Sequence, residues 1–196
     1  MLAVLGPSGL RQRYAFRPAQ WGSLGRPIIK IKELKQGVTT ATPRCVEEDI
    51  DQKYWIEPGD LLFSWSADLG VYRWSGEPGL LNQHLFVVTP RDGQSTSFLQ
   101  HALDGAMAQF WDRAQGTTMR HIKRSALVEV SALVPPVQVV DAFTKAVEPW
   151  EQETLTLQRL GRNLTDLRDL LLPRLVTGKI DVSNLDLDAL TEAAMS

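Results

Sequence analysis

The feature that most constrains the fold of this chain is a stripe of large apolar residues in its last third. The stripe repeats every seven residues, with further leucines at the intermediate heptad position. Its members are Phe143, Trp150, Leu157, Leu160, Leu164, Leu167 and Leu171. Such a repeat is typical of a helix that packs lengthwise against another helix. Residues 136–180 are therefore predicted to form one long coiled-coil-type helix.

Two residues weaken the first part of this pattern. Pro149 should kink or split the helix, because proline lacks the backbone N–H that the helix needs, and Glu153 interrupts the apolar set. A helix cannot bury such a stripe by itself. The partner is another helix of this chain, a second copy of the chain or another protein. A terminal helix that lies on its own domain remains an alternative.

The sequence before the helix has the mixed pattern of a globular α/β (α+β) domain, expected over residues 1–135. Residues 1–26 are rich in Gly, Pro and Arg and are expected to be irregular. An amphipathic helix is expected over Ser97–Arg113, where apolar residues recur at helical spacing. Strands are expected where apolar residues alternate or run together between turn residues. These segments are Pro27–Leu34, Asp60–Ser66, Val71–Trp74, Leu85–Val88 and Val128–Val134.

A single cysteine, Cys45, excludes both a disulfide framework and a cysteine metal cluster. It fits the reducing cytoplasm, where we expect the protein to reside. Cys45 is expected to be a buried or idle thiol. No apolar run approaches the length that spans a bilayer, so no membrane association is expected.

The net charge of −2 conceals an uneven distribution. Residues 181–196 hold four acids and no Lys or Arg, and this tail is expected to be disordered. Residues 1–32 hold six cations and no acid, and residues 113–124 hold four cations and no acid. Local basic surface matters more for phosphate contact than the total charge. A solvated face of mixed charge is the alternative explanation.

Five segments, in this order, resemble the specificity (S) subunits of Type I restriction-modification systems. The resemblance runs over residues 27–181. The segments are Pro58–Ser64 with Gly70, Leu81–Leu85, Ala114–Thr118 with His121, Ile122 and Leu127, Val134–Pro136 with Gln138, and Leu170–Ile180. Each segment is a weak signal alone, and their order and spacing make the match specific.

The resemblance implies a fold, partners and a mode of action. Subunits of this family have two target recognition domains, each followed by a long helix, and the two helices pair as an antiparallel coiled coil. This chain resembles half of such a subunit. Two copies paired through the stripe would read a bipartite inverted-repeat target on double-stranded DNA. A methyltransferase subunit is the expected catalytic partner, a translocase-nuclease subunit is left open, and no cofactor is expected.

Candidate DNA contacts follow from the chemistry of phosphate and base recognition. Gly116, Thr117 and Thr118 can offer N–H and hydroxyl groups to a phosphate, with cations following them. Lys30 and Lys32 would lie on one face of the expected strand. The candidate DNA-binding residues are Lys30, Lys32, Arg73, Gly116, Thr117, Thr118, Arg120, Lys123 and Arg124. A helix C-cap with a basic turn, and an ordinary polar sheet face, are the structural alternatives.

Base reading requires Arg on guanine, or Asn or Gln on adenine. Several residues in expected loops or at strand ends fit, without a ranking: Gln36, Gln52, Arg73, Arg91 and Gln94. Asn82–His84 leads into a core strand, which favours a structural role for its hydrogen bonds. Trp65 is expected in the core.

The sequence supplies no catalytic constellation. His84, His101 and His121 share no short spacing, and no zinc motif, phosphate-binding loop or nucleophile elbow is present. Asp60 follows a Pro-Gly turn and is expected to cap it. We therefore expect a non-enzymatic protein without a metal site. The alternatives are an assembly module without DNA specificity and a small nuclease, which would need clustered carboxylates.

Overall fold

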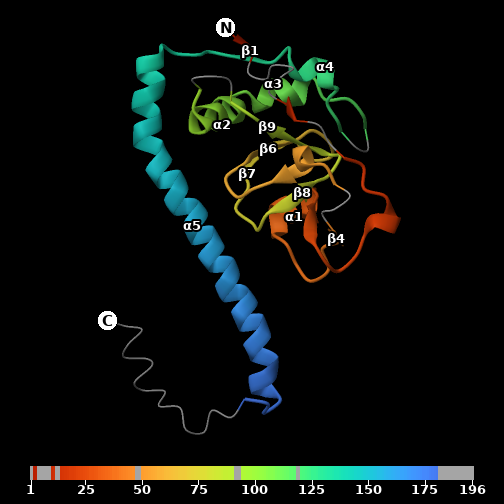
Figure 1. Cartoon of the computed structure of the whole chain (residues 1–196). Helices are drawn as coiled ribbons and strands as arrows, with labels where there is room; N and C mark the ends of the chain where they lie inside the picture. The colour runs from red at the N-terminus through yellow and green to blue at the C-terminus, as the bar shows by residue number, and fades with distance from the viewer. Residues whose placement is uncertain are drawn as a thin grey trace. The chain divides into compact units, whose positions relative to one another are not determined.

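The computed structural model describes residues 2–3, 10–11, 14–46, 50–90, 94–117 and 120–180 of the chain. The chain divides into two compact units, Met1–Thr156 and Leu157–Ser196. The first unit contains every described strand, and the helix α5 (Val137–Val176) begins in it (Figure 1). The acidic tail over 181–196, expected to be disordered, lies outside the described residues.

The strands of the first unit form two four-stranded sheets and one short ladder. The first sheet is antiparallel, in the order β2 (Leu10–Arg11), β9 (Leu85–Val88), β6 (Leu61–Ser64) and β7 (Gly70–Arg73). The second is mixed, in the order β4 (Arg44–Cys45), β3 (Arg26–Ile29), β8 (Gly79–Leu81) and β5 (Trp55–Ile56). The ladder joins β1 (Leu2–Ala3) to β10 (Ser131–Ala132).

Both faces of the first sheet are buried, which explains why its central strands are continuous apolar runs. Leu61 and Phe63 of β6 face a core shared with the helices α2 (Thr96–Gly105), α3 (Met107–Asp112) and α4 (Arg124–Leu127). Leu62, between them, faces a core shared with the second sheet. In Figure 1, α2 and α3 lie over β9 and β6. The α/β domain followed by a long helix, predicted from the sequence, is confirmed.

The expected strand over Pro27–Leu34 is wrong beyond Ile29. The strand β3 ends there, and the short helix α1 (Ile31–Gln36) begins. The carboxylate of Glu33 accepts a hydrogen bond from the backbone N–H of Lys30 at 3.1 Å and so caps this helix. Lys30 and Lys32 therefore belong to the start and the first turn of a helix, not to a sheet face.

Two further expectations need correction. The single helix expected over Ser97–Arg113 is interrupted at Ala106, whose φ of −93° and ψ of 1° leave the helical range directly after Gly105. The last strand, expected over Val128–Val134, is reduced to the two residues of β10, because only these pair with β1.

The helix α5 runs through Pro149 without a break, so the predicted split is wrong. Contacts with α2 flank the proline. The ring of Phe143 lies 6.3 Å from that of Phe98, and Ser97 Oγ donates a hydrogen bond to Glu151 Oε2 at 2.5 Å. We infer that these contacts offset the hydrogen bond that proline cannot make.

Candidate nucleic-acid interface

The candidate phosphate-binding segment is a loop with fixed ends. Gln115 and His121 exchange two backbone hydrogen bonds of 2.8 Å each, which close the loop between α3 and α4. Gly116 allows the turn because its φ is +97°, a value that other residues rarely adopt. Gly116 and Thr117 are exposed on this loop. Thr118, also predicted to bind DNA, lies outside the described residues.

The far end of the loop is attached to the chain that follows β6. The backbone N–H of Ala67 donates to the carbonyl of Arg120 at 2.7 Å, and that of Ile122 donates to the carbonyl of Trp65 at 3.0 Å. The side chain of Ile122 is buried in the same core as β6. Arg120, Lys123 and Arg124 flank Ile122 in the sequence, so these contacts hold the backbone that carries the three cations.

Three predicted DNA-binding cations, Arg120, Lys123 and Arg124, lie together at this end of the loop. All three are exposed, and within the described part of the chain no carboxylate forms an ion pair with any of them. The guanidinium of Arg120 lies 5.6 Å from the Trp111 ring, and that of Arg124 lies 5.8 Å from the Phe86 ring. Their charges are available to a phosphate backbone, since no acid among the described residues neutralises them.

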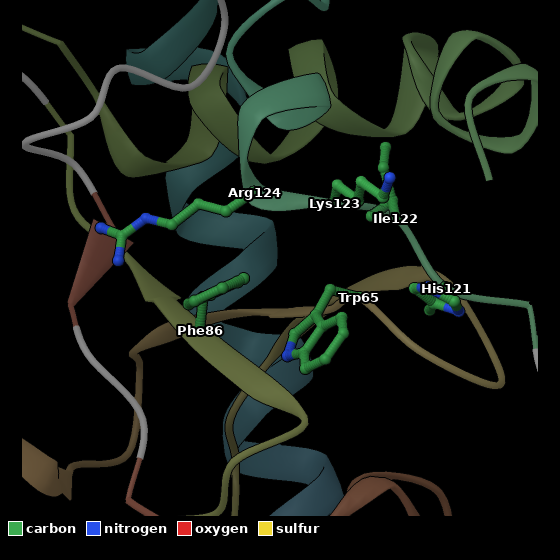
Figure 2. A pocket seen from close by; sticks show the side chains of 6 residues that line it. All are labelled: Trp65, Phe86, His121, Ile122, Lys123 and Arg124. Carbon is green, nitrogen blue, oxygen red and sulfur yellow. The ribbon is translucent and has the colours of Figure 1, made fainter. Parts of the chain in front are cut away.

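A pocket of about 240 Å³ opens beside these cations (Figure 2). Figure 2 shows the rings of Trp65 and Phe86 opposite the segment His121–Arg124. We call this hollow the aromatic pocket; its lining residues are Trp65, Phe86, His121, Ile122, Lys123 and Arg124. Trp65 is half-buried, so its expected place in the core is only partly right: it packs against the core and also lines the pocket.

The other three predicted DNA contacts lie elsewhere. The ammonium of Lys30 sits 4.0 Å from the centre of the Trp21 ring, and Lys32 is exposed on α1. Arg73 ends the strand β7, and its Nε and Nη1 are buried without a hydrogen-bond partner among the described residues. In the part of the chain that the structure describes, no hydrogen bond, ion pair or ring contact joins these three residues to the loop. The structure thus brings together only part of the predicted set.

The segment Asn82–His84 makes hydrogen bonds of the kind that its position suggested. Asn82 is buried, its backbone N–H donates to the carbonyl of Ile29 at 3.1 Å, and His84 Nδ1 lies 2.8 Å from Ser66 Oγ. Asp60 likewise caps its turn, accepting a hydrogen bond from the backbone N–H of Glu57 at 2.9 Å. Among the unranked base readers, Gln36 and Gln52 are exposed, Gln94 is half-buried and Arg91 lies outside the described residues.

The residues of the helical stripe fall into two groups. Phe143 packs against α2, with its ring 5.3 Å from that of His101. Leu171 is half-buried. The remaining members have 50–76% of their surface exposed: Trp150, Leu157, Leu160, Leu164 and Leu167. An apolar row of this extent is typical of a helix that packs against another helix.

The described residues also bear on other classes of function. No group of three His, Cys, Asp or Glu side chains is arranged to hold a metal ion among them. Within the same residues, none of the helices combines the length and hydropathy needed to cross a membrane.

Sequence comparison finds relatives among proteins of one kind, although no family model matches the chain. The HindI specificity subunit of Haemophilus influenzae is 29% identical over 161 residues, covering 79% of this chain and 35% of that protein. The EcoBI specificity subunit of Escherichia coli is 23% identical over 180 residues, covering 88% and 37%. Both are Type I restriction enzyme subunits. The chain thus spans about a third of the length of these curated relatives.

The fold is similar to that of a solved structure of the same kind of protein. The S subunit of a Type I restriction-modification system from M. genitalium superposes with a TM-score of 0.60 at 14% identity. The match covers 97% of this chain and 53% of that one. The resemblance to Type I specificity subunits, expected from the motifs in the sequence, is confirmed by the chain's relatives and by its fold.

Proposed function

We propose that this chain is a sequence-specific DNA recognition subunit of a Type I restriction-modification (methyltransferase) complex. The observation that carries the proposal is the group of three cations, Arg120, Lys123 and Arg124, which form no ion pair with the described carboxylates and lie on a loop with fixed ends. Phosphate contacts supply most of the affinity of DNA-binding proteins and set their register on the duplex.

In this proposal the loop binds the DNA backbone and adjoining groups read the bases. The exposed N–H groups of Gly116 and Thr117 add donors to the three cations. Thr118, Lys30, Lys32 and Arg73 remain candidates for further contacts. The chain itself acts without catalysis or a cofactor, and a methyltransferase subunit supplies the chemistry in the cytoplasm.

The exposed stripe of α5 supports the second part of the proposal. A second copy of the chain would cover Leu157, Leu160, Leu164 and Leu167. The chain matches 53% of the length of the M. genitalium subunit, so two copies have about the extent of one such subunit. A two-fold pair would present two recognition domains and would select a bipartite inverted repeat.

The test of DNA binding is the triple change of Arg120, Lys123 and Arg124 to Ala. We expect weaker binding to every duplex, and a slope of log Kd against log salt that falls by about 2.7 for each bound chain, since each lost phosphate contact removes about 0.9. The measurement is the Kd for duplex DNA over a series of salt concentrations, by fluorescence anisotropy.

A matched triple controls for loss of charge alone. Lys35, Lys53 and Arg168 are exposed cations that already pair with Asp68, Asp51 and Asp169. Their change to Ala should leave the slope within about 0.5 of the wild-type value. Equal effects of the two triples would contradict the proposed interface. A folded protein that binds no duplex would favour an assembly module instead.

A further inference from the structure

The aromatic pocket has a composition that phosphate binding does not require. Three of its lining residues are apolar, namely Trp65, Phe86 and Ile122. The imidazole of His121 also lines it, and the exposed cations Lys123 and Arg124 lie at its rim. Its volume of about 240 Å³ is below the range of about 300–1,000 Å³ that holds a whole small molecule. The pocket is therefore suited to one group of a larger ligand that the neighbouring cations hold.

The wall formed by Trp65 is fixed from several directions. Its indole N–H donates to the carbonyl of Gln83 at 3.0 Å, and its backbone N–H donates to the carbonyl of His84 at 3.3 Å. The ring of His84 stacks on the indole with 5.7 Å between ring centroids. A rigid apolar wall loses little conformational entropy when a ligand binds, so it is preorganised for contact.

The cations at the rim indicate that the ligand is DNA, and the apolar wall indicates which part of it. In the major groove the apolar group that a base edge presents is the C5-methyl of thymine. A donor or acceptor of a base edge placed against these three side chains would lose its hydrogen bond to water without replacement. We propose that the aromatic pocket receives the C5-methyl group of a thymine in the target, an inference that rests on the proposed function.

An extruded base is the competing occupant, and the geometry disfavours it. Enzymes that flip a base hold it between stacked side chains. Here the rings of Trp65 and Phe86 are inclined by 35° with centroids 6.2 Å apart, so they form no parallel slot. The pocket therefore fits a group that projects from a stacked base.

The experiment uses the full chain with its selected target duplex. Each thymine is replaced in turn by deoxyuridine, which removes only the methyl group, and Kd is measured for each duplex. We expect one position in each half-site at which the replacement weakens binding about fourfold, as burial of one methyl group predicts. At that position Trp65→Leu should abolish the difference between thymine and uracil.

Two controls separate this effect from general loss of binding. Lys123→Ala should weaken binding to every duplex and preserve the fourfold ratio, because it removes charge and leaves the apolar wall. Trp21→Leu changes an exposed tryptophan outside the pocket and should preserve the ratio as well. Thermal unfolding checks that each variant is folded, and Trp65→Gln, which places a polar side chain on the wall, replaces Trp65→Leu if the latter unfolds below the assay temperature.

The outcomes distinguish the pocket from the proposed function. A target that is insensitive to uracil at every position, or a ratio that survives Trp65→Leu, overturns the pocket assignment and leaves DNA recognition intact. A thymine that becomes more reactive to permanganate on binding is extruded, which also overturns it. Failure of the folded protein to select any duplex overturns both proposals.

Discussion

The first and second halves of α5 carry the same heptad stripe but bury it differently. Before residue 157, Phe143 of the stripe lies against α2, and Val140 and Leu155, which are outside the stripe, are buried, whereas Trp150 is exposed. From residue 157 to residue 167, the leucines of the stripe keep at least half of their surface exposed, as at Leu157 and Leu164. A heptad repeat indicates that a helix needs a partner, and it does not say whether the partner is the chain's own domain or another helix.

The largest expected effect is a change of oligomeric state, caused by substitutions in the half of α5 from residue 157 onward. Leu157→Asp with Leu164→Asp should convert a dimer to monomers, because a dimer would lose four buried leucines worth about 1.5–3 kcal/mol each. Light scattering coupled to size-exclusion chromatography measures the mass. The matched control is Gln158→Asp with Thr165→Asp, which adds the same charge one residue further along the helix. An unchanged mass in the leucine variant would contradict a dimer through this stripe.

Substitutions in the half of α5 before residue 157 should change the free energy of unfolding of the monomer. In the Leu157→Asp, Leu164→Asp background, Phe143→Ala should lower the free energy of unfolding by about 2 kcal/mol, less than a fully buried phenylalanine would. Trp150→Ala removes a larger side chain of the same stripe, but that side chain is 76% exposed. Its effect should stay within about 0.5 kcal/mol. Urea titration followed by circular dichroism measures both, and a larger loss for Trp150→Ala than for Phe143→Ala would contradict the packing of Phe143 against α2.

A polar contact provides a second test of the same half. Glu151→Ala removes the acceptor of the Ser97 hydroxyl and the partner of His101, whose Nε2 lies 3.4 Å from Glu151 Oε1. We expect a loss of about 1.5 kcal/mol, since hydrogen bonds to charged groups exceed neutral ones. Glu153→Ala, an exposed glutamate two residues further on, should cost less than about 0.5 kcal/mol in the same urea titration. Similar losses at both positions would mean that Glu151 does not hold the helix on α2.

The smallest effect is expected at Gly161. A Cβ built there meets no atom within 4 Å, so Gly161→Ala should stabilise the helix by about 0.8 kcal/mol. Thermal unfolding measures the gain, and the mass should still be that of a dimer. Loss of the dimer would instead place Gly161 at a close helix–helix contact, where a methyl group does not fit.

Prediction from the sequence was most accurate where an apolar pattern fitted only one kind of element. The apolar run Leu85–Val88 predicted β9 to the residue, and the heptads predicted α5 to within a few residues. The alternation of apolar and basic residues over Ile29–Lys32 led to a wrong strand prediction, because so short a pattern also fits the first turn of a helix. The capping hydrogen bond of Glu33, which decides between them, becomes visible only in the fold.

The candidate site was harder to predict for a similar reason. The sequence could group Arg120, Lys123 and Arg124, since they are neighbours along the chain. It could not show that the segment they occupy is joined to the end of β6, because that contact links residues more than 50 positions apart. Trp65 lines the pocket because of this contact. The sequence around Trp65 does not distinguish it from a tryptophan in the core.

The most direct test of the account is enrichment of random duplex DNA by this protein mixed with a Type I methyltransferase subunit. We predict recovery of a short inverted repeat split by a spacer of constant length, because two identical recognition domains would be related by a two-fold axis. Recovery of one unrepeated half-site would contradict pairing through α5. Recovery of no sequence by a folded protein would contradict DNA recognition itself.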